Sequence, residues 1–324
     1  MIADSDRLPL IAAANRAPSV HNIQPARFRF ENARIITIVE EPNCRLFVGD
    51  PECKDNQKSL GAALEGLVLA LSERGLGCDI KKQESGLRVT LASGGEPDAL
   101  APFAGSRATY RGAFAPRSDS DHAALARIGK HCGDLHIIEA PDDIDIIARL
   151  YDKVSLDVLR APAYRAELLS WMRLSRRHPA YARDGLNAEQ MALSPVEAAA
   201  ASVVLGAQAF PLLDSLRLAG PLIAEGAKVK SAAGLALFHR PIAEPELNTG
   251  RRFYRIWLEF ERAGLCLCPM SVLADVPDAA DKLLRGAGLS AERKLVTVFR
   301  IGRRPEGAHI PPRTRLPAEE LIVA

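Results

Sequence analysis

The stretch Ser59-Leu-Gly-Ala-Ala-Leu-Glu-Gly-Leu-Val-Leu-Ala-Leu71 decides the fold of this chain. It lies within a segment of about 57–74 that is apolar on most faces of a helix, so we predict a buried helix rather than a surface one. Gly75 follows, as a glycine commonly does just beyond a helix end. We expect the surrounding elements to be built around this long buried helix.

A second stretch repeats this plan later in the chain. Gly61–Gly75 and Gly250–Gly264 have the same length and lie 189 positions apart (250 − 61 and 264 − 75), and apolar residues coincide along both. Each stretch leads into a strand that contains cysteine. The alternative is a chance likeness, since short apolar periods are ambiguous. We predict an internal duplication, with a first half at 1–100 and a second half at 101–324.

Strand and helix signals surround both stretches. Alternating residues around Phe28 and Phe30, followed by a β-branched run, predict a hairpin. Helices are expected at 142–159 and 167–177, and Ser194-Pro-Val-Glu197 is a capping box that marks another helix start. Further strands are expected at 87–91, 135–138, 234–239 and 295–301. The pattern predicts an α+β fold with mixed, mostly antiparallel sheets and one long buried helix in each half.

Bulk composition excludes several classes of protein. The 324 residues carry a net charge of +2, with 48% apolar and 25% charged residues, which is typical of a globular protein and not of a nucleic-acid or membrane surface. None of the six cysteines forms a Cys-x-x-Cys pair, so we expect reduced thiols and no metal site. We therefore expect a cytoplasmic protein with a small-molecule substrate.

The loop Pro18-Ser-Val-His-Asn-Ile-Gln-Pro25 concentrates hydrogen-bonding side chains between a short helix and a strand. Its two prolines stiffen the backbone. Ser19, Asn22 and Gln24 then present donors and acceptors from a rigid loop, which suits a polar ligand. A well-capped turn is the alternative. His21 has no identifiable carboxylate partner, and we interpret it as structural.

Two arginine pairs are candidate phosphate sites. Arg107-Ala-Thr-Tyr-Arg111 places two guanidinium groups around the hydroxyl of Thr109, and Arg313-Thr-Arg315 lies on a stiff segment between prolines. Guanidinium groups bind phosphate oxygens in a bidentate manner. Solvated surface charge is the alternative for each pair, because exposed arginine is common.

Other signatures are absent or less specific. Gly264-Leu-Cys-Leu-Cys-Pro-Met-Ser271 indicates a strand that passes into a loop at Pro269. The chain lacks the glycine-rich dinucleotide loop, the P-loop, the Gly-x-Ser-x-Gly nucleophile and the His-Glu-x-x-His zinc motif. These absences disfavour a glycine-loop nucleotide site, a serine hydrolase and a zinc protease.

Taken together, these segments resemble the nitroreductase family, which has a three-layer α+β fold and binds FMN. The loop from Pro18 is similar to the family's Pro-Ser-Ser-x-Asn-x-Gln-Pro-Trp loop, which lines the flavin. The segments at 107–111 and 312–317 are similar to its two phosphate-binding arginine motifs, and 264–271 to the strand and loop that face flavin N5. The resemblance implies these cofactor-binding residues: Pro18, Ser19, Val20, Asn22, Gln24, Arg107, Thr109, Arg111, Pro269, Met270, Ser271, Arg313 and Arg315.

The order of the motifs points to one branch of that family. In single-length members the phosphate motif precedes the loop, and the flavin lies between two subunits. Here the loop is in the first half and the other motifs are in the second, so the chain resembles the double-length branch in which one chain mimics the homodimer. Ala26, Val20 and Ser271 depart from the family's usual Trp, Ser and Glu, and Arg173 is the candidate for its middle flavin contact.

The resemblance implies two functions. The first is an FMN-dependent oxidoreductase that takes hydride from NADH or NADPH and passes it to a nitroaromatic, a quinone or an enone, with no catalytic side chain. The second is a protein that sequesters FMN with little turnover, with a lid formed by an insert at about 152–190. In either case we expect a monomeric pseudo-dimer or a homodimer of such chains.

Overall fold

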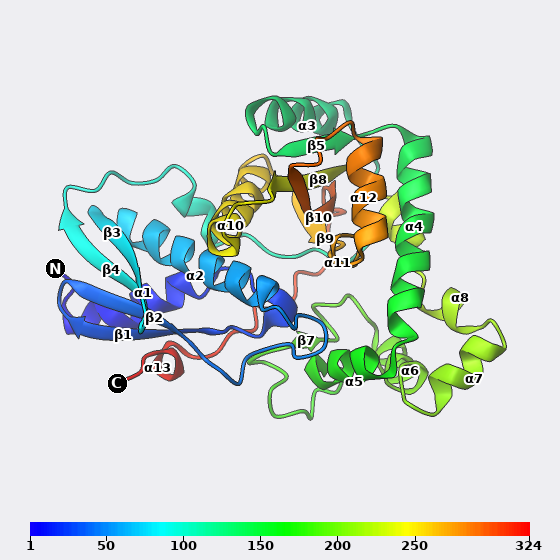
Figure 1. Cartoon of the computed structure of the whole chain (residues 1–324), viewed down its shortest axis with the longest axis horizontal. Helices are drawn as coiled ribbons and strands as arrows, with labels where there is room; N and C mark the ends of the chain where they lie inside the picture. The colour runs from blue at the N-terminus through cyan, green and yellow to red at the C-terminus, as the bar shows by residue number, and fades with distance from the viewer.

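The computed structural model describes all residues 1–324 (Figure 1). The N-terminal elements are α1 (Asp4–Ala14), η1 (Val20–Asn22), β1 (Ala26–Asn32), β2 (Ile35–Glu40), α2 (Lys54–Ser72), β3 (Leu76–Gln83), β4 (Gly86–Ser93) and η2 (Ala101–Ala104). The next elements are α3 (Asp119–His131), β5 (Leu135–Ile138), α4 (Pro141–Leu159), α5 (Pro162–Trp171), β6 (Met172–Arg173), β7 (Leu186–Asn187), α6 (Pro195–Val204), α7 (Ala209–Ser215), α8 (Ala219–Ile223) and α9 (Gly226–Lys230). The last are β8 (Gly234–Pro241), α10 (Glu246–Arg262), β9 (Cys266–Pro269), α11 (Val272–Asp275), α12 (Pro277–Gly286), β10 (Arg293–Gly302) and α13 (Ala318–Leu321).

Two antiparallel four-stranded sheets organise these elements. One has the order β1-β2-β4-β3 and the other β5-β8-β10-β9. If the four strands of each sheet are numbered 1 to 4 in chain order, both sheets have the spatial order 1-2-4-3. In both sheets a long helix, α2 or α10, lies between the second and third strands in the chain. The chain is therefore α+β with mostly antiparallel sheets, as the sequence predicts. The only parallel sheet is the short pair β6–β7.

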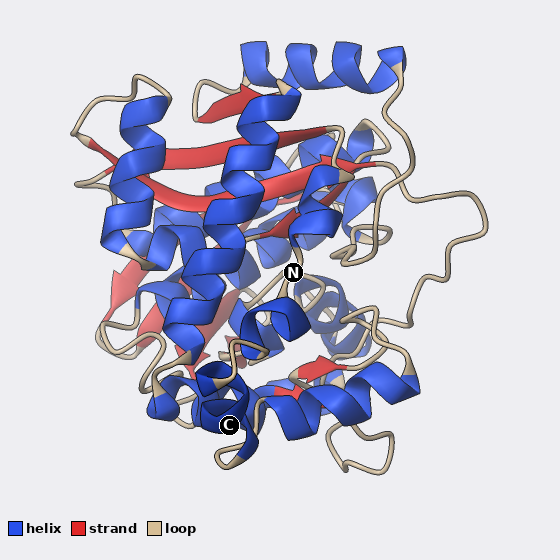
Figure 2. Cartoon of the chain, turned by 90° about the vertical axis from the view of Figure 1, so that its right-hand side faces the viewer, coloured by secondary structure: helices blue, strands red, loops and turns tan.

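Helices cover both faces of the second sheet (Figure 2). Alternate residues of β8 point to opposite faces, as a strand requires. Ala236 and Phe238 belong to the core shared with α3 and α10, whereas Leu235 and Leu237 belong to the core shared with α4 and α12. Because both faces are covered, β8 is a continuous apolar run rather than an alternating one.

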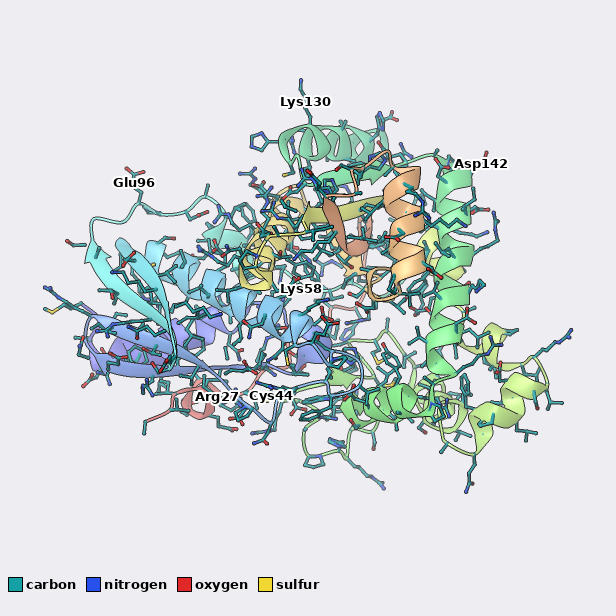
Figure 3. All side chains as sticks on the ribbon, in the orientation of Figure 1. Arg27, Cys44, Lys58, Glu96, Lys130 and Asp142 are labelled. Atoms are coloured by element: carbon teal, nitrogen blue, oxygen red, sulfur yellow. The ribbon has the colours of Figure 1, made fainter.

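The long helices α2 and α10 cross in direct backbone contact. A Cβ on Gly61 would lie 2.0 Å from the carbonyl oxygen of Leu247, and a Cβ on Gly250 would lie 1.9 Å from that of Lys58. Gly61 and Gly250 are 189 positions apart, and so are Lys58 and Leu247, so the two contacts are reciprocal. Lys58, labelled in Figure 3, lies on α2 at this crossing. Such reciprocity is the mark of a two-fold interface, where i contacts j and j contacts i.

Ion pairs reinforce this crossing from one side of the helices. The carboxylate of Glu65, which is buried in α2, accepts hydrogen bonds from Arg251 at 2.8 Å and from Arg255 at 2.8 Å. A buried carboxylate is tolerated only when it is paired and hydrogen-bonded. Glu65 is the one charged residue in the apolar part of the stretch quoted first, and this pairing explains its presence there.

The C-terminal segment returns to the first sheet. In Figure 1 it runs back beside β1, and Val323 donates its amide to the carbonyl of Phe28 at 3.0 Å. Leu321 is fully buried in the core of α1, α2 and the first sheet. The residues just before α13, which include Arg313 and Arg315, are thereby held against the first part of the chain.

One helix prediction is wrong at its end. The helix expected over 167–177 stops at Trp171, because Met172 and Arg173 pair with β7 and Arg173 binds the carboxylate of Asp184 at 2.7 Å. No single helix is long and apolar enough to cross a membrane; the bent pair α6 and α7 meets the length and composition requirement together.

Candidate functional site

Four segments that are far apart in sequence meet at one pocket. They are the loop after α1, the segment after η2, the end of the insert at β7, and the segment before α13. The pocket holds about 620 Å³ of empty space, part of which is open to solvent. Thirteen residues line it: Pro18, Ser19, His21, Asn22, Arg107, Ala108, Thr109, Arg111, Leu186, Gln190, Pro311, Arg313 and Arg315.

The loop after α1 has an unusual backbone. His21, Asn22 and Gln24 have φ values of 43°, 57° and 52°, in the left-handed region that non-glycine residues rarely adopt. Backbone strain of this kind costs roughly 1–3 kcal/mol per residue and persists only where the surroundings enforce it. The loop is therefore a built feature of the site rather than a simple turn.

Hydrogen bonds from the side chains of Asn22 and Gln24 hold the loop in this strained conformation. The amide of Asn22 donates to Gly185 O and Thr314 O at 3.2 Å each, and its oxygen accepts from Arg315 at 2.6 Å. The Gln24 amide donates to Arg183 O at 2.8 Å and accepts from the Leu316 amide. These bonds tie the loop to the insert and to the C-terminal segment.

Not every loop residue predicted for the site reaches the pocket. Gln24 and Val20 are absent from its lining; the amide of Val20 donates to Ser59 Oγ at 3.0 Å. Pro18, Ser19 and Asn22 do line it. Ser19 also accepts from the amide of Gln24 at 3.1 Å, so its hydroxyl oxygen holds the loop while the residue faces the pocket.

Four arginines converge on the pocket without any acidic partner. Arg107, Arg111, Arg313 and Arg315 line it, and none of them forms an ion pair. Burial, and next the charge of Arg313, lowers the pKa of Arg107 to about 10. Burial, then Arg107 and Arg313, lowers the pKa of Arg315. Unpaired like charges raise the free energy of the folded chain unless an anion binds between them.

Backbone carbonyls hold these guanidinium groups in place. Arg315 donates to Asn15 O at 2.7 Å and to Ala17 O at 3.1 Å, and Arg313 donates to Gly105 O at 3.1 Å. The guanidinium of Arg107 lies 4.7 Å from the centre of the Trp257 ring, a cation–π contact. Positions fixed in this way need no reordering when a ligand arrives.

Two polar atoms behind the cluster have no partner. Arg107 Nε is buried with no hydrogen bond, and so is the hydroxyl of Tyr254 on α10. Native structures satisfy most buried polar groups, and an exception calls for an explanation. The ligand site is indicated by the four arginines at the pocket, whose unpaired positive charges suit an anionic ligand.

The segment 107–111 lies beside β9. Thr109 forms a parallel bridge with Leu267, and the Tyr110 amide donates to Leu267 O at 3.1 Å. Arg111 donates to Gln190 O at 3.1 Å. This pairing positions Thr109 and Arg111 at the pocket wall.

The predicted strand-to-loop residues lie outside the pocket lining. Met270 is buried in the core, and its amide donates to Val298 O at 2.7 Å. Pro269 ends β9, and Ser271 Oγ lies 3.5 Å from Thr297 Oγ1. Arg173, the candidate middle contact, instead pairs with Asp184. No observation places these four residues at the pocket.

Sequence reasoning missed five lining residues: Ala108, Leu186, Gln190, Pro311, and His21, which was interpreted as structural. Gln190 Nε2 donates to Thr314 Oγ1 at 2.7 Å, so it links the insert to the C-terminal segment. Gln190 belongs to no recognisable motif, and the sequence indicated only that it lies at the end of a long insertion. The insert, 152–190, contains the end of α4, all of α5, and β6 and β7.

The anion site predicts that inorganic phosphate stabilises the apoprotein. Phosphate should bind the folded chain and not the unfolded one, so at ten times its dissociation constant the free energy of unfolding should rise by about 1.4 kcal/mol. Thermal unfolding in increasing phosphate, against sodium chloride of equal ionic strength, measures this rise. An equal rise with chloride would show general screening and no specific site.

The fold and the site together define an α+β protein with a cationic pocket lined by four arginines. No protein-family model matches the chain, and no curated protein matches it. Solved structures of nitroreductase-like flavoproteins match its fold over about two thirds of its length.

Three of these structures illustrate the match. A nitroreductase with bound FMN from Bacteroides fragilis is 12% identical, with a TM-score of 0.35, over 67% of this chain and 94% of its own. The FMN-dependent nitroreductase NfnB from Mycobacterium smegmatis, in complex with NADPH, is 17% identical, with a TM-score of 0.37, over 66% and 95%. A BluB-like flavoprotein from Clostridium difficile is 16% identical, with a TM-score of 0.36, over 70% and 99%. At these values, function must be argued from the residues of this chain.

Proposed function

We propose that this protein binds FMN and is an NAD(P)H-dependent oxidoreductase of the nitroreductase type. The observation that carries the proposal is the convergence of four unpaired arginines and a strained polar loop on one pocket. A phosphate monoester is a dianion with several acceptor oxygens, which matches the unpaired charge of the four lining arginines.

Eight of the thirteen lining residues have a role in this proposal. Arg107, Arg111, Arg313 and Arg315 hold the phosphate, and Thr109 adds a hydroxyl donor. Pro18, Ser19 and Asn22 form the opposite wall and exclude water from the rest of the ligand. When bound, FMN supplies hydride chemistry, from NADH or NADPH to a nitroaromatic, a quinone or an enone.

We also propose that the chain arose by internal duplication and mimics a dimer. The identical strand order of the two sheets supports this, as does the reciprocal contact of Gly61 and Gly250. On this proposal the pocket combines a loop from residues 1–100 with arginines from residues 101–324. One chain then carries a complete site of the kind that otherwise needs two subunits.

The alternative is that the protein sequesters FMN with little turnover. Leu186 and Gln190 come from the insert and line the pocket, and Gln190 is bonded to both Arg111 and Thr314. Because the insert is hydrogen-bonded to the segments that carry Arg111 and Thr314, it would cover a bound ligand and keep reactants away. Long insertions near a site commonly serve as covers.

Anaerobic reduction separates the two functions. FMN-loaded protein should lose its yellow colour when NADH or NADPH is added without oxygen, and a quinone should restore the colour. Colour that persists in excess reductant would favour sequestration. Protein that takes up no FMN would contradict both functions, and absorbance at the flavin maximum gives all three results.

A further inference from the structure

His21 lines the pocket, and the proposed cofactor site gives its side chain no role. It lines the pocket from the middle of η1, with the strained φ of 43°. Its neighbours in the loop are fixed by the bonds of Asn22 and Gln24 to three other segments. A chain that only needed to turn here would not hold a histidine in the left-handed region.

The hydrogen-bond state of the ring follows from its two nitrogens. Nδ1 is buried and has no partner. Nε2 also has no partner in the protein but is not enclosed, so it is the nitrogen at the pocket surface. A buried N–H without an acceptor is rarer and more costly than a buried lone pair without a donor. The proton therefore resides on Nε2, and Nε2–H is a donor to the pocket.

The charged groups around His21 leave the ring neutral. Burial lowers its pKa below the ordinary value, and the charge of Arg111 lowers it further. The opposing influences are Asp55 on α2 and Glu167 on α5. Asp55 pairs with Lys58 at 2.5 Å, and the carboxylate of Glu167 accepts from the Gly49 amide at 2.7 Å, so neither acid bonds to the ring. The lowered pKa favours the neutral imidazole.

We propose that His21 Nε2–H donates a hydrogen bond to the oxygen atom of the electron acceptor, the substrate class being quinones and other carbonyl compounds. This rests on the proposed oxidoreductase function. Addition of a hydride, two electrons and one proton, to a quinone leaves one oxygen negatively charged. His21 stabilises that charge, and a proton from water in the open pocket completes the hydroquinone. The neutral ring keeps its own proton, because loss of it would leave an imidazolate.

Two variants test the role of the ring while preserving the backbone. His21→Asn keeps a residue that tolerates positive φ but has a shorter reach, and His21→Gln keeps an N–H donor at greater reach. The holoprotein is reduced without oxygen by NADPH or NADH and then mixed with 1,4-benzoquinone. We expect reoxidation to slow by about 10- to 100-fold in His21→Asn and to recover partly in His21→Gln, since the pocket is partly open to water.

Binding gives a second measurement without turnover. The probe is 4-cyanophenolate, which carries the anionic oxygen of a reduced product, titrated by calorimetry into oxidised holoprotein. We expect about tenfold weaker binding to His21→Asn. In wild-type protein the reoxidation rate should not change between pH 7 and 9, because a neutral donor does not titrate there. A fall over that range that is absent in His21→Asn would mean that the ring acts as an acid, and would overturn the proposal.

Other results would also overturn the proposed role of His21. Unchanged reoxidation in His21→Asn would remove the ring from the reaction. An equal change in FMN affinity or in the rate of flavin reduction would assign the hydrogen bond to the cofactor instead. If wild-type protein takes up no FMN or is not reduced, the proposed function fails, and this inference with it, before any variant is compared.

Discussion

Arg111→Ala combined with Arg313→Ala should weaken FMN binding by about 10²- to 10⁴-fold. Each guanidinium makes charged hydrogen bonds worth roughly 1.5–3 kcal/mol, and a factor of ten corresponds to about 1.4 kcal/mol. Both side chains line the pocket without an acidic partner. Fluorescence titration of the apoprotein with FMN measures the dissociation constant.

This pair is a better choice than one that includes Arg315. The guanidinium of Arg315 binds Asn22, Asn15 and Ala17, so its removal would loosen the loop and would not isolate the ligand. Arg111 makes one bond, to Gln190 O. Arg313 donates only to backbone carbonyls, those of Ala104, Gly105 and Arg107, and its loss with Arg111 relieves the repulsion that both exert on Arg107, so the melting temperature of the apoprotein should change little.

The matched control removes two charges elsewhere. Arg127 and Arg177 are exposed and form no ion pair, and Arg127→Ala with Arg177→Ala makes the same change in net charge. Riboflavin, which lacks the phosphate, should bind wild type and the pocket variant alike. Equal weakening of FMN binding in the control, or unchanged FMN binding in the pocket variant, would contradict the proposed phosphate site.

Short sequence motifs correctly predicted the elements whose position depends on residues close together in the chain. The Ser194 capping box is present, with the serine side chain accepting from the Glu197 amide. The hairpin after Phe28 also formed, because its alternation matches one buried face. The helix over 167–177 was wrong because Arg173 has a partner, Asp184, eleven positions away, which no helical period reveals.

The candidate site was predictable where several polar residues share a segment. The loop from Pro18 and both arginine pairs meet at one pocket. Their polar and charged side chains are grouped in short segments, which is a signal that the sequence alone can show. The strand does end at Pro269, as predicted, but the assignment of Met270 to the flavin site rested on resemblance alone, and its side chain lies in the core. Gln190 could not be found from sequence, since its role depends on how a long insert folds back onto Thr314.

Gly61→Ala should lower the free energy of unfolding by about 3 kcal/mol or more, above the usual 1–3 kcal/mol of overpacking. The added methyl would lie 2.0 Å from Leu247 O, and a helix backbone cannot yield as a side chain does. The helices must separate, which also pulls Arg251 and Arg255 from buried Glu65. The gain of up to about 1 kcal/mol from replacing a helical glycine is much smaller. Urea unfolding of the apoprotein measures the loss.

Gly286→Ala is the matched control, because a methyl there meets nothing within 4 Å. It should leave stability unchanged or raise it by up to about 1 kcal/mol. Gly250→Ala should match Gly61→Ala, since its methyl would lie 1.9 Å from Lys58 O in the reciprocal contact. The double variant should lose much less than the two single losses combined, because one separation of the helices relieves both clashes. Strict additivity would show that the two glycines act in independent contacts, and would remove this crossing as support for a two-fold origin of the chain.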